Sequence, residues 1–351
     1  MNPLAAGALL CAALPVLAFA AGRAHNRRKY KIRTPEGVQT AENFPLGGIG
    51  QYVRIRGWSR ANPVLLVLHG GPGSTLGDAA CRWQGALERH YTVVHWDQRG
   101  CGNTDFRAPG AEKPTLERLL SDLDQLVDHL RTAFGQERVL LMGHSWGILL
   151  GGLYAARHPE KTAAFLAVSP MLDFRASERL SAQEAARRAR EAGREGDARA
   201  IEEELTWLPS LRELDRENAG KLLRFRQRKE KYLPAQYGGQ GLPARLLSPD
   251  FTAGDLRWML RVDRLVANNR ELYRALLSDG SGCPLCYKIP VIVAAGELDW
   301  TTPYILAADW FHRLSAPAKE FLSLAETGHL PFQERPEYFA EELLAALRRI
   351  T

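Results

Sequence analysis

The stretch LLMGHSWGILLGG, residues 140–152, decides the fold of this chain. It places Ser145 between Gly143 and Gly147, directly after one apolar run and directly before another. This match to G-x-S-x-G lies where a predicted strand passes into a predicted helix, the setting of a sharp turn that presents its serine. The chain has 31 glycines, and about 0.1 such matches are expected by chance. The strand–helix setting therefore favours a reactive serine over a small residue in an ordinary tight turn.

Short continuous apolar runs recur along the chain, and turn-forming or polar residues bound each of them. Such runs are typical of strands that are buried on both faces between layers of helices. One further segment, residues 52–57, alternates as a half-buried strand does. Strands are therefore expected at residues 52–57, 63–71, 91–97, 138–145, 162–170, 290–296 and 319–326.

Helical patterns lie between several of these predicted strands. Leucines and a valine at helical spacing predict a helix that follows Thr115 and ends at Gly135. Residues 146–157, 303–314 and 335–349 are expected to form further helices. Strand and helix in alternation predict an α/β fold, with a mainly parallel sheet that helices cover on both faces.

Residues 172–281 break this alternation, because they contain no clear strand and carry a long stretch rich in Arg, Glu and Ala. We interpret them as a helical cap that divides the core into residues 36–171 and 282–351. The charge runs of the cap are expected to be solvated helix faces. Its apolar and aromatic side chains must pack on something, and the top of the sheet is the expected partner of Trp207, Leu208, Leu211, Phe225, Tyr232 and Trp258.

The net charge of +6 comes from the N-terminal end of the chain. Residues 1–33 carry six Lys/Arg and no Asp/Glu, so the rest of the chain has as many acidic as basic side chains. This local excess argues against a nucleic-acid partner. Residues 4–22 carry no charge, and about 20 such residues span a bilayer.

We therefore expect residues 1–35 to form a signal anchor with a basic flank, which contacts the membrane and keeps the domain cytoplasmic. The alternative is a signal peptide with the A-x-A site Ala18-Phe19-Ala20 and an exported domain.

A serine hydroxyl becomes a nucleophile when a base takes its proton, and that base needs a carboxylate to orient it. In a fold of this kind the acid and then the histidine follow the serine, each on a loop after a strand. Asp299 follows the predicted strand at 290–296, and His329 follows the one at 319–326. Ser145, Asp299 and His329 are therefore expected to form a catalytic triad.

Other residues fit the roles of acid and base less well. Asp173, after the predicted strand at 162–170, is the main alternative acid, and Glu297 is a lesser one. His69 precedes the serine in the chain, His95 lies inside a predicted strand, and His144 would point away from Ser145. The remaining histidines before the C-terminal part of the chain lie on predicted helices or at their ends: His90, His129, His158 and His312.

Acyl transfer also needs N–H donors for the oxyanion that develops on the substrate. The backbone N–H of Trp146, directly after the serine, is expected to be one donor. The other should come from the loop after the predicted strand at 63–68, which reads HGGPG. The N–H of Gly71 is the expected second donor, and a plain glycine-rich turn is the alternative.

The segments LHGGPG, WDQRGCGNT, GHSWG, GELD and TGH together resemble the prolyl-iminopeptidase-like branch of the α/β-hydrolase superfamily. The resemblance covers roughly residues 50–170 and 285–350. It implies an α/β-hydrolase fold and a triad at Ser145, Asp299 and His329.

The same resemblance implies that Gly70 and Gly71 line the oxyanion hole and that residues 97–102 form a structural loop. Thr104 stands where the family usually has serine. The cap departs further, because the W-x-x-W-E-like segment that supplies a glutamate for the substrate's amino group in that family is absent from the sequence. Residues 202–204 are glutamates without that context, and we expect them on a solvated face.

The sequence thus predicts a serine hydrolase that works without a cofactor or metal. An aminopeptidase-like enzyme for short peptides or small-molecule amides is the first choice, and a carboxylesterase or lactonase is the runner-up. A ligand-binding receptor with an intact triad but little turnover is the rival from another class. Cys283 and Cys286 form an isolated C-x-x-C, which favours two loop cysteines or a local disulfide over a metal or redox site.

Overall fold

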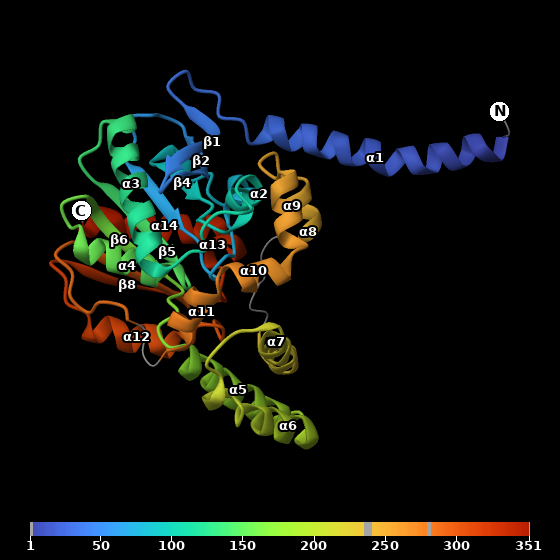
Figure 1. Cartoon of the computed structure of the whole chain (residues 1–351), viewed down its shortest axis with the longest axis vertical. Helices are drawn as coiled ribbons and strands as arrows, with labels where there is room; N and C mark the ends of the chain where they lie inside the picture. The colour runs from blue at the N-terminus through green and yellow to red at the C-terminus, as the bar shows by residue number, and fades with distance from the viewer. Residues whose placement is uncertain (1–2, 235–240, 279–281, 351) are drawn as a thin grey trace.

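The computed structural model describes residues 3–234, 241–278 and 282–350. Within them, one sheet of eight strands has the order β1-β2-β4-β3-β5-β6-β7-β8 (Figure 1). β1, β2 and β4 pair in antiparallel fashion, and all later pairings are parallel. The predicted mainly parallel sheet is confirmed. Its strands are β1 Val38–Leu46, β2 Ile49–Gly57, β3 Val64–Leu68, β4 Thr92–Trp96, β5 Val139–His144, β6 Thr162–Val168, β7 Val291–Gly296 and β8 Lys319–Leu324.

The central strands are buried on both faces, as their continuous apolar runs predict. In β3, Val64, Leu66 and Leu68 belong to the hydrophobic cluster on one face of the sheet. Leu65 and Val67 belong to the cluster on the other face. Successive side chains of a strand point to opposite faces, so a strand between two layers of helices needs an apolar residue at every position.

Helices cover both faces, as predicted. The helix that follows Thr115 begins and ends as expected, because the Thr115 side chain accepts a hydrogen bond from the Arg118 N–H and Gly135 adopts a left-handed φ of 62°. One face carries α3 Leu116–Phe134, α4 Gly147–Arg157 and α12 Tyr304–Arg313. The other carries η1 Gly77–Arg82, η2 Leu87–Arg89, α13 Pro331–Glu334 and α14 Pro336–Ile350, and α2 Gly102–Arg107 follows β4.

β1 is a strand that the sequence did not predict. It pairs with β2 along its whole length, and the two are joined directly at Gly47 and Gly48. Most positions of β1 are exposed, because it lies at the edge of the sheet. An edge strand with so little burial lacks the apolar alternation that reveals a strand in a sequence.

Between β6 and β7, the described residues form helices and no strand. Most of the apolar side chains that were expected on the top of the sheet pack instead on one another, in a cluster that includes Leu208, Leu211 and Phe225. Residues 235–240 and 279–281 of the predicted cap lie outside the described residues, and the boundaries of the cap stay a prediction. The helices are α5 Phe174–Glu191, α6 Glu195–Leu205, η3 Leu208–Ser210, α7 Arg216–Glu230, α8 Leu242–Leu246, α9 Ala253–Met259, α10 Val262–Asn268 and α11 Arg270–Leu277.

The N-terminal segment forms one helix, α1 (Pro3–Lys29), which projects from the body (Figure 1). Its basic end is attached to the body, because Arg23 donates to the carbonyl of Phe251 (3.0 Å) and Asn26 to that of Leu247 (3.0 Å). In the described part of the chain, no helix combines the length and the apolar character needed to cross a membrane. The anchor or signal peptide expected in residues 1–35 stays a prediction.

Candidate active site

The connection between β5 and α4 is a strained turn centred on Ser145, whose φ is +55°. Its glycines are required by close packing. A Cβ on Gly143 would lie 2.7 Å from the carbonyl oxygen of Gly147, and one on Gly147 would lie 2.4 Å from that of Leu68. The Ser145 N–H donates to the carbonyl of Val168 in β6 (3.0 Å). The turn therefore holds the serine rigidly at the carboxyl end of the sheet.

Asp299 and His329 meet on the loops that follow β7 and β8. The Nδ1 atom of His329 lies 2.9 Å from Oδ2 of Asp299. The carboxylate also accepts hydrogen bonds from the N–H groups of Thr301 and Thr302, both at 2.8 Å, and from the Thr302 hydroxyl at 2.7 Å. Burial raises the pKa of Asp299, but His329 and the Thr302 hydrogen bonds outweigh it, so the pKa lies below its usual value. The lowered pKa thus favours the ionised carboxylate beside the imidazole.

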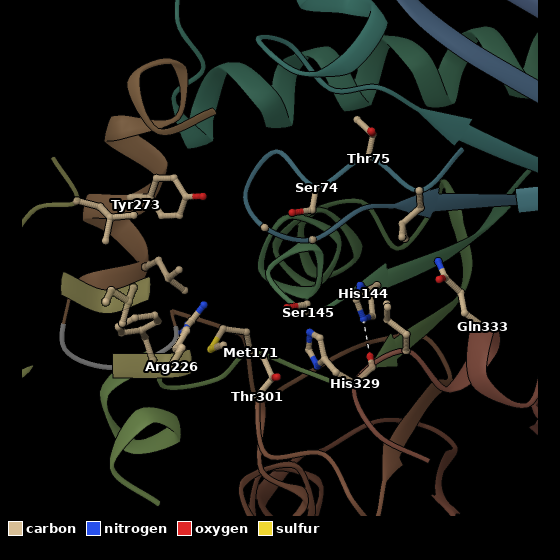
Figure 2. Close-up of a pocket in the computed structure, with 18 of the residues that line it drawn as sticks. Ser74, Thr75, His144, Ser145, Met171, Arg226, Tyr273, Thr301, His329 and Gln333 are labelled. Atoms are coloured by element: carbon tan, nitrogen blue, oxygen red, sulfur yellow. Dashed lines mark hydrogen bonds between the residues drawn. The ribbon is translucent and has the colours of Figure 1, made fainter. Parts of the chain in front are cut away.

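Ser145 and His329 both line a cavity of about 460 Å³ at this edge of the sheet. Figure 2 shows the His329 side chain next to Ser145, with the loop that carries Ser74 on the opposite side of the cavity. The fold thus brings the three residues expected to form a triad to one place, although they come from loops up to 184 positions apart. Their catalytic roles stay a prediction.

The residues expected to form the oxyanion hole lie beside the serine. A Cβ on Gly70 would come within 2.8 Å of the Ser145 Cβ, so only glycine allows this approach. Gly71 has a φ of +113°, which side chains rarely adopt. Within the described chain, neither the N–H of Gly71 nor that of Trp146 donates a hydrogen bond to a protein acceptor. An oxyanion donor needs such an uncommitted N–H, and the role of these two groups as donors stays a prediction.

Two side chains from the helical insertion hold this glycine-rich loop, and neither contact could be predicted from the sequence. The indole N–H of Trp258 in α9 donates to the carbonyl of Gly73 (2.8 Å). The hydroxyl of Tyr273 in α11 donates to the carbonyl of Pro72 (3.1 Å). Such pairings join segments almost 200 positions apart, and helical periodicity does not reveal them.

A buried ionic network joins the loop after β4 to α9. Arg54 contacts Asp97 (3.3 Å) and Asp255 (2.7 Å), and Asn103 donates to Asp255 (2.8 Å). The hydroxyl of Thr104 donates to the carbonyl of Asp97. A serine hydroxyl could make the same bond, which accounts for threonine at a position where the resembling family has serine.

The alternative acids and bases are engaged elsewhere. Asp173 accepts from the Ala176 N–H (2.8 Å) at the start of α5, and Glu297 accepts from the Ser323 hydroxyl (2.7 Å). His144 directs Nε2 at the His329 carbonyl oxygen (2.9 Å). Burial lowers the pKa of His144 and of His95 to about 3 and that of His69 to about 4, so these three imidazoles are weak bases.

The two cysteines of the C-x-x-C do not form a disulfide with each other. Cys283 is partly buried, and Cys286 is exposed on the segment before β7. The structure therefore agrees with the interpretation of Cys283 and Cys286 as two loop cysteines, and not with a local disulfide.

Comparisons with known proteins agree with this architecture. A model of the alpha/beta hydrolase fold family matches residues 63–336. A Bacillus subtilis protein named "Probable aminopeptidase YbaC" is 26% identical over 331 residues, which cover 89% of this chain and 97% of that protein. The proline iminopeptidase of Lactobacillus delbrueckii subsp. lactis is 32% identical over 146 residues, or 41% of this chain and 47% of that enzyme.

A solved structure shares the fold. The proline iminopeptidase-related protein from Thermus thermophilus has a TM-score of 0.53 and 24% identity, and the match covers 89% of this chain and 98% of that one. Because the family model spans more than half of the chain, the protein belongs to the alpha/beta hydrolase fold family, in agreement with its resemblance to prolyl-iminopeptidase-like proteins.

Proposed function

We propose that the protein is a serine hydrolase that cleaves small amides or short peptides through an acyl-enzyme. Ser145 Oγ attacks the substrate carbonyl carbon while Nε2 of His329 accepts the serine proton. The resulting oxyanion accepts hydrogen bonds from the N–H groups of Gly71 and Trp146. His329 then donates the proton to the leaving amine, and the C–N bond breaks. Water, deprotonated by His329, attacks the ester carbon and releases the acid and Ser145.

The observation that carries this proposal is the Asp299–His329 pair. A buried carboxylate 2.9 Å from Nδ1 keeps the proton on that nitrogen and leaves Nε2 as the acceptor. The imidazolium formed during attack is stabilised by the same charge. A ligand-binding receptor has no need of an oriented imidazole beside a serine on a strained turn, and this favours an enzyme.

The cleavage of amide bonds is supported by the names of the relatives. The Bacillus subtilis relative, aligned over 97% of its length, carries the name of an aminopeptidase, and the Lactobacillus relative is a proline iminopeptidase. Esters and lactones remain the second class to examine, because the same triad chemistry cleaves both.

A fluorophosphonate probe, which reacts with activated serines, tests the proposal directly. Ser145→Ala should abolish labelling and lower kcat on the order of 10⁴-fold or more. Ser74→Ala is the matched control, because Ser74 also lines the cavity and the variant should keep its labelling. Undiminished labelling and turnover in Ser145→Ala would overturn the proposal. A panel of aminoacyl amides, short-chain esters and lactones then ranks the substrate classes by kcat/KM.

A further inference from the structure

The charged side chains that line the cavity are unequally exposed. They are Asp78 in η1, Arg226 in α7 and Arg245 in α8. The side chains of Arg226 and Arg245 are 31% and 28% exposed, whereas that of Asp78 is only 4% exposed. The two guanidinium groups are therefore the more exposed charges of the cavity wall, and the Asp78 carboxylate is the less exposed one.

Arg226 is fixed in place by its neighbours. Its Nε donates to Glu178 (2.7 Å), and its guanidinium lies 5.5 Å from the centre of the Phe174 ring. Figure 2 shows Arg226 beside Met171, on the side of the cavity where the helical insertion lies. Glu178 is buried and also contacts Lys229. Two basic side chains thus share one carboxylate, and this cluster keeps a formal excess of positive charge.

The exposed cation of that cluster is Arg226. Burial lowers the pKa of Lys229, despite the opposing effect of Glu178, whereas the guanidinium of arginine stays charged. Lys229 is 5% exposed and does not line the cavity. The charge that a substrate experiences on this side is therefore that of Arg226.

Arg245 has the same arrangement on the other part of the wall. Its Nε donates to Asp78 (2.7 Å), which holds α8 against η1. A carboxylate behind each guanidinium orients it and reduces the entropy that it would lose on binding an anion. Preorganised guanidinium groups are well suited to carboxylates, because the planar fork matches the two oxygens.

An enzyme that selects a free amino terminus needs the opposite arrangement, with an exposed carboxylate near the acyl group. Glu202, Glu203 and Glu204 do not line the cavity. Glu202 pairs with Arg190 (2.6 Å) and Glu204 with Arg228 (3.1 Å), both on partly exposed surface. The expectation that these glutamates belong to a solvated face therefore agrees with their contacts.

We propose that the cavity selects substrates that carry a carboxylate, which Arg226 and Arg245 bind, over substrates with a free α-ammonium group. This inference rests on the proposed serine-hydrolase function and narrows its substrates to amides or esters with an anionic acyl portion. The same two guanidinium groups would repel a positive charge on the substrate. This repulsion is stronger in the cavity than in bulk solution, because less water is present there to screen it.

Three alanine 4-nitroanilides that differ only at the amino group test this directly: the free amine, the N-acetyl compound and the N-succinyl compound. The kcat/KM value should rise in that order, with the succinyl compound at least about tenfold above the acetyl one. Arg226→Met and Arg245→Met should each lower the value for the succinyl compound about tenfold and change that for the acetyl compound little. Arg190→Met, on the outer surface, is the control and should change neither.

Protection of Ser145 from the fluorophosphonate probe gives a second readout that needs no turnover. N-succinyl-alaninamide should slow labelling at lower concentration than N-acetyl-alaninamide or alaninamide, and added salt should reduce the difference. Strongest protection by alaninamide, or equal protection by all three, would overturn the inference and leave the hydrolase function intact. A chain whose Ser145 is never labelled and which cleaves none of the three would overturn both.

Discussion

The helices α9–α11 and the helices α5–α7 each contribute to the wall of the cavity beside Ser145, the first group through α11 and the second through α5 and α7. Different forces hold the two groups. The first group is joined to the core by buried polar contacts. Asp255 contacts Arg54, Trp258 bonds the carbonyl of Gly73, and Tyr273 bonds that of Pro72. These contacts reach the loop that carries the expected oxyanion donor.

The helices α5–α7 are held largely by an apolar cluster, to which α11 adds Tyr273 and Leu277. Alanines of α5, Ile201 of α6 and Leu222 and Phe225 of α7 pack together. In Figure 1 these helices project away from the sheet. Many of their charged residues pair on the exposed surface, for example Arg187 with Glu184 and Glu191.

This difference indicates which helices of the insertion can be substituted without disturbing the geometry of the candidate active site. Hydrogen bonds and ion pairs in a buried network have strict geometry, and one lost partner leaves a buried charge or carbonyl unpaired. An apolar cluster tolerates exchanges that keep its volume. We infer that α9–α11 fix the position of the glycine-rich loop. Substrate preference depends instead on Arg226 in α7 and on Arg245 in α8.

The largest expected effect comes from the network that holds α9. Arg54→Met leaves Asp97 and Asp255 buried without their cation, and removal of one partner from a buried ion pair costs about 3–5 kcal/mol. Urea unfolding should show a loss of that size in the free energy of unfolding. The matched control is Arg187→Met on α5, whose exposed ion pairs contribute less than about 1 kcal/mol. Equal losses in the two variants would erase the distinction between the two groups of helices.

An intermediate effect is expected from Glu178, the buried acid of α5 that contacts Arg226 and Lys229. Burial raises the pKa of Glu178, but Arg226 and Lys229 outweigh it and lower the pKa to about 2. A carboxylate whose pKa is lower in the folded than in the unfolded state contributes stability above the unfolded pKa of about 4.5, and this contribution is lost as the pH falls towards 2.

Glu178→Gln should therefore lower the free energy of unfolding by roughly 2 kcal/mol at pH 7. The gap from the unaltered protein should narrow between pH 5 and pH 3, as urea titrations at several pH values would show. If the difference in the free energy of unfolding stayed constant over this pH range, the stabilisation would not come from the ionised form of Glu178. Glu191→Gln is the control, since Glu191 pairs with Arg187 on the exposed surface of α5.

The sequence predicted the parts of the site that depend on local pattern. Ser145 and Asp299 follow the buried strands β5 and β7, and His329 follows the edge strand β8. The carboxyl ends of parallel strands meet at one edge of the sheet. Strand periodicity and chain order were therefore enough to predict that these residues would meet. β1 was not predicted, because most of its positions are exposed and its sequence therefore lacks an apolar pattern.

The charged side chains that line the cavity were not predicted either, for another reason. Helical periodicity shows which face of α7 is apolar, but not which distant segment that face meets. Arg226 and Arg245 looked like any other arginine in a charge-rich insertion, and the buried carboxylates behind them come from other segments of the chain. Trp258 was recognised as a side chain that must pack, but its partner, the loop after β3, lies 185 positions away.

The smallest effect, and the sharpest test of the comparison, concerns Trp258. Trp258→Phe keeps an aromatic ring but removes the N–H that bonds the Gly73 carbonyl, two residues after Gly71. Loss of one such bond corresponds to about 1 kcal/mol, or roughly a fivefold fall in kcat if the strain passes to the oxyanion donor. KM should change little, because this bond positions the loop and does not touch the substrate. Trp207→Phe, in the α5–α7 group, should leave kcat unchanged. If Trp258→Phe lowered stability alone and kept kcat, α9 would be a structural support with no influence on the site.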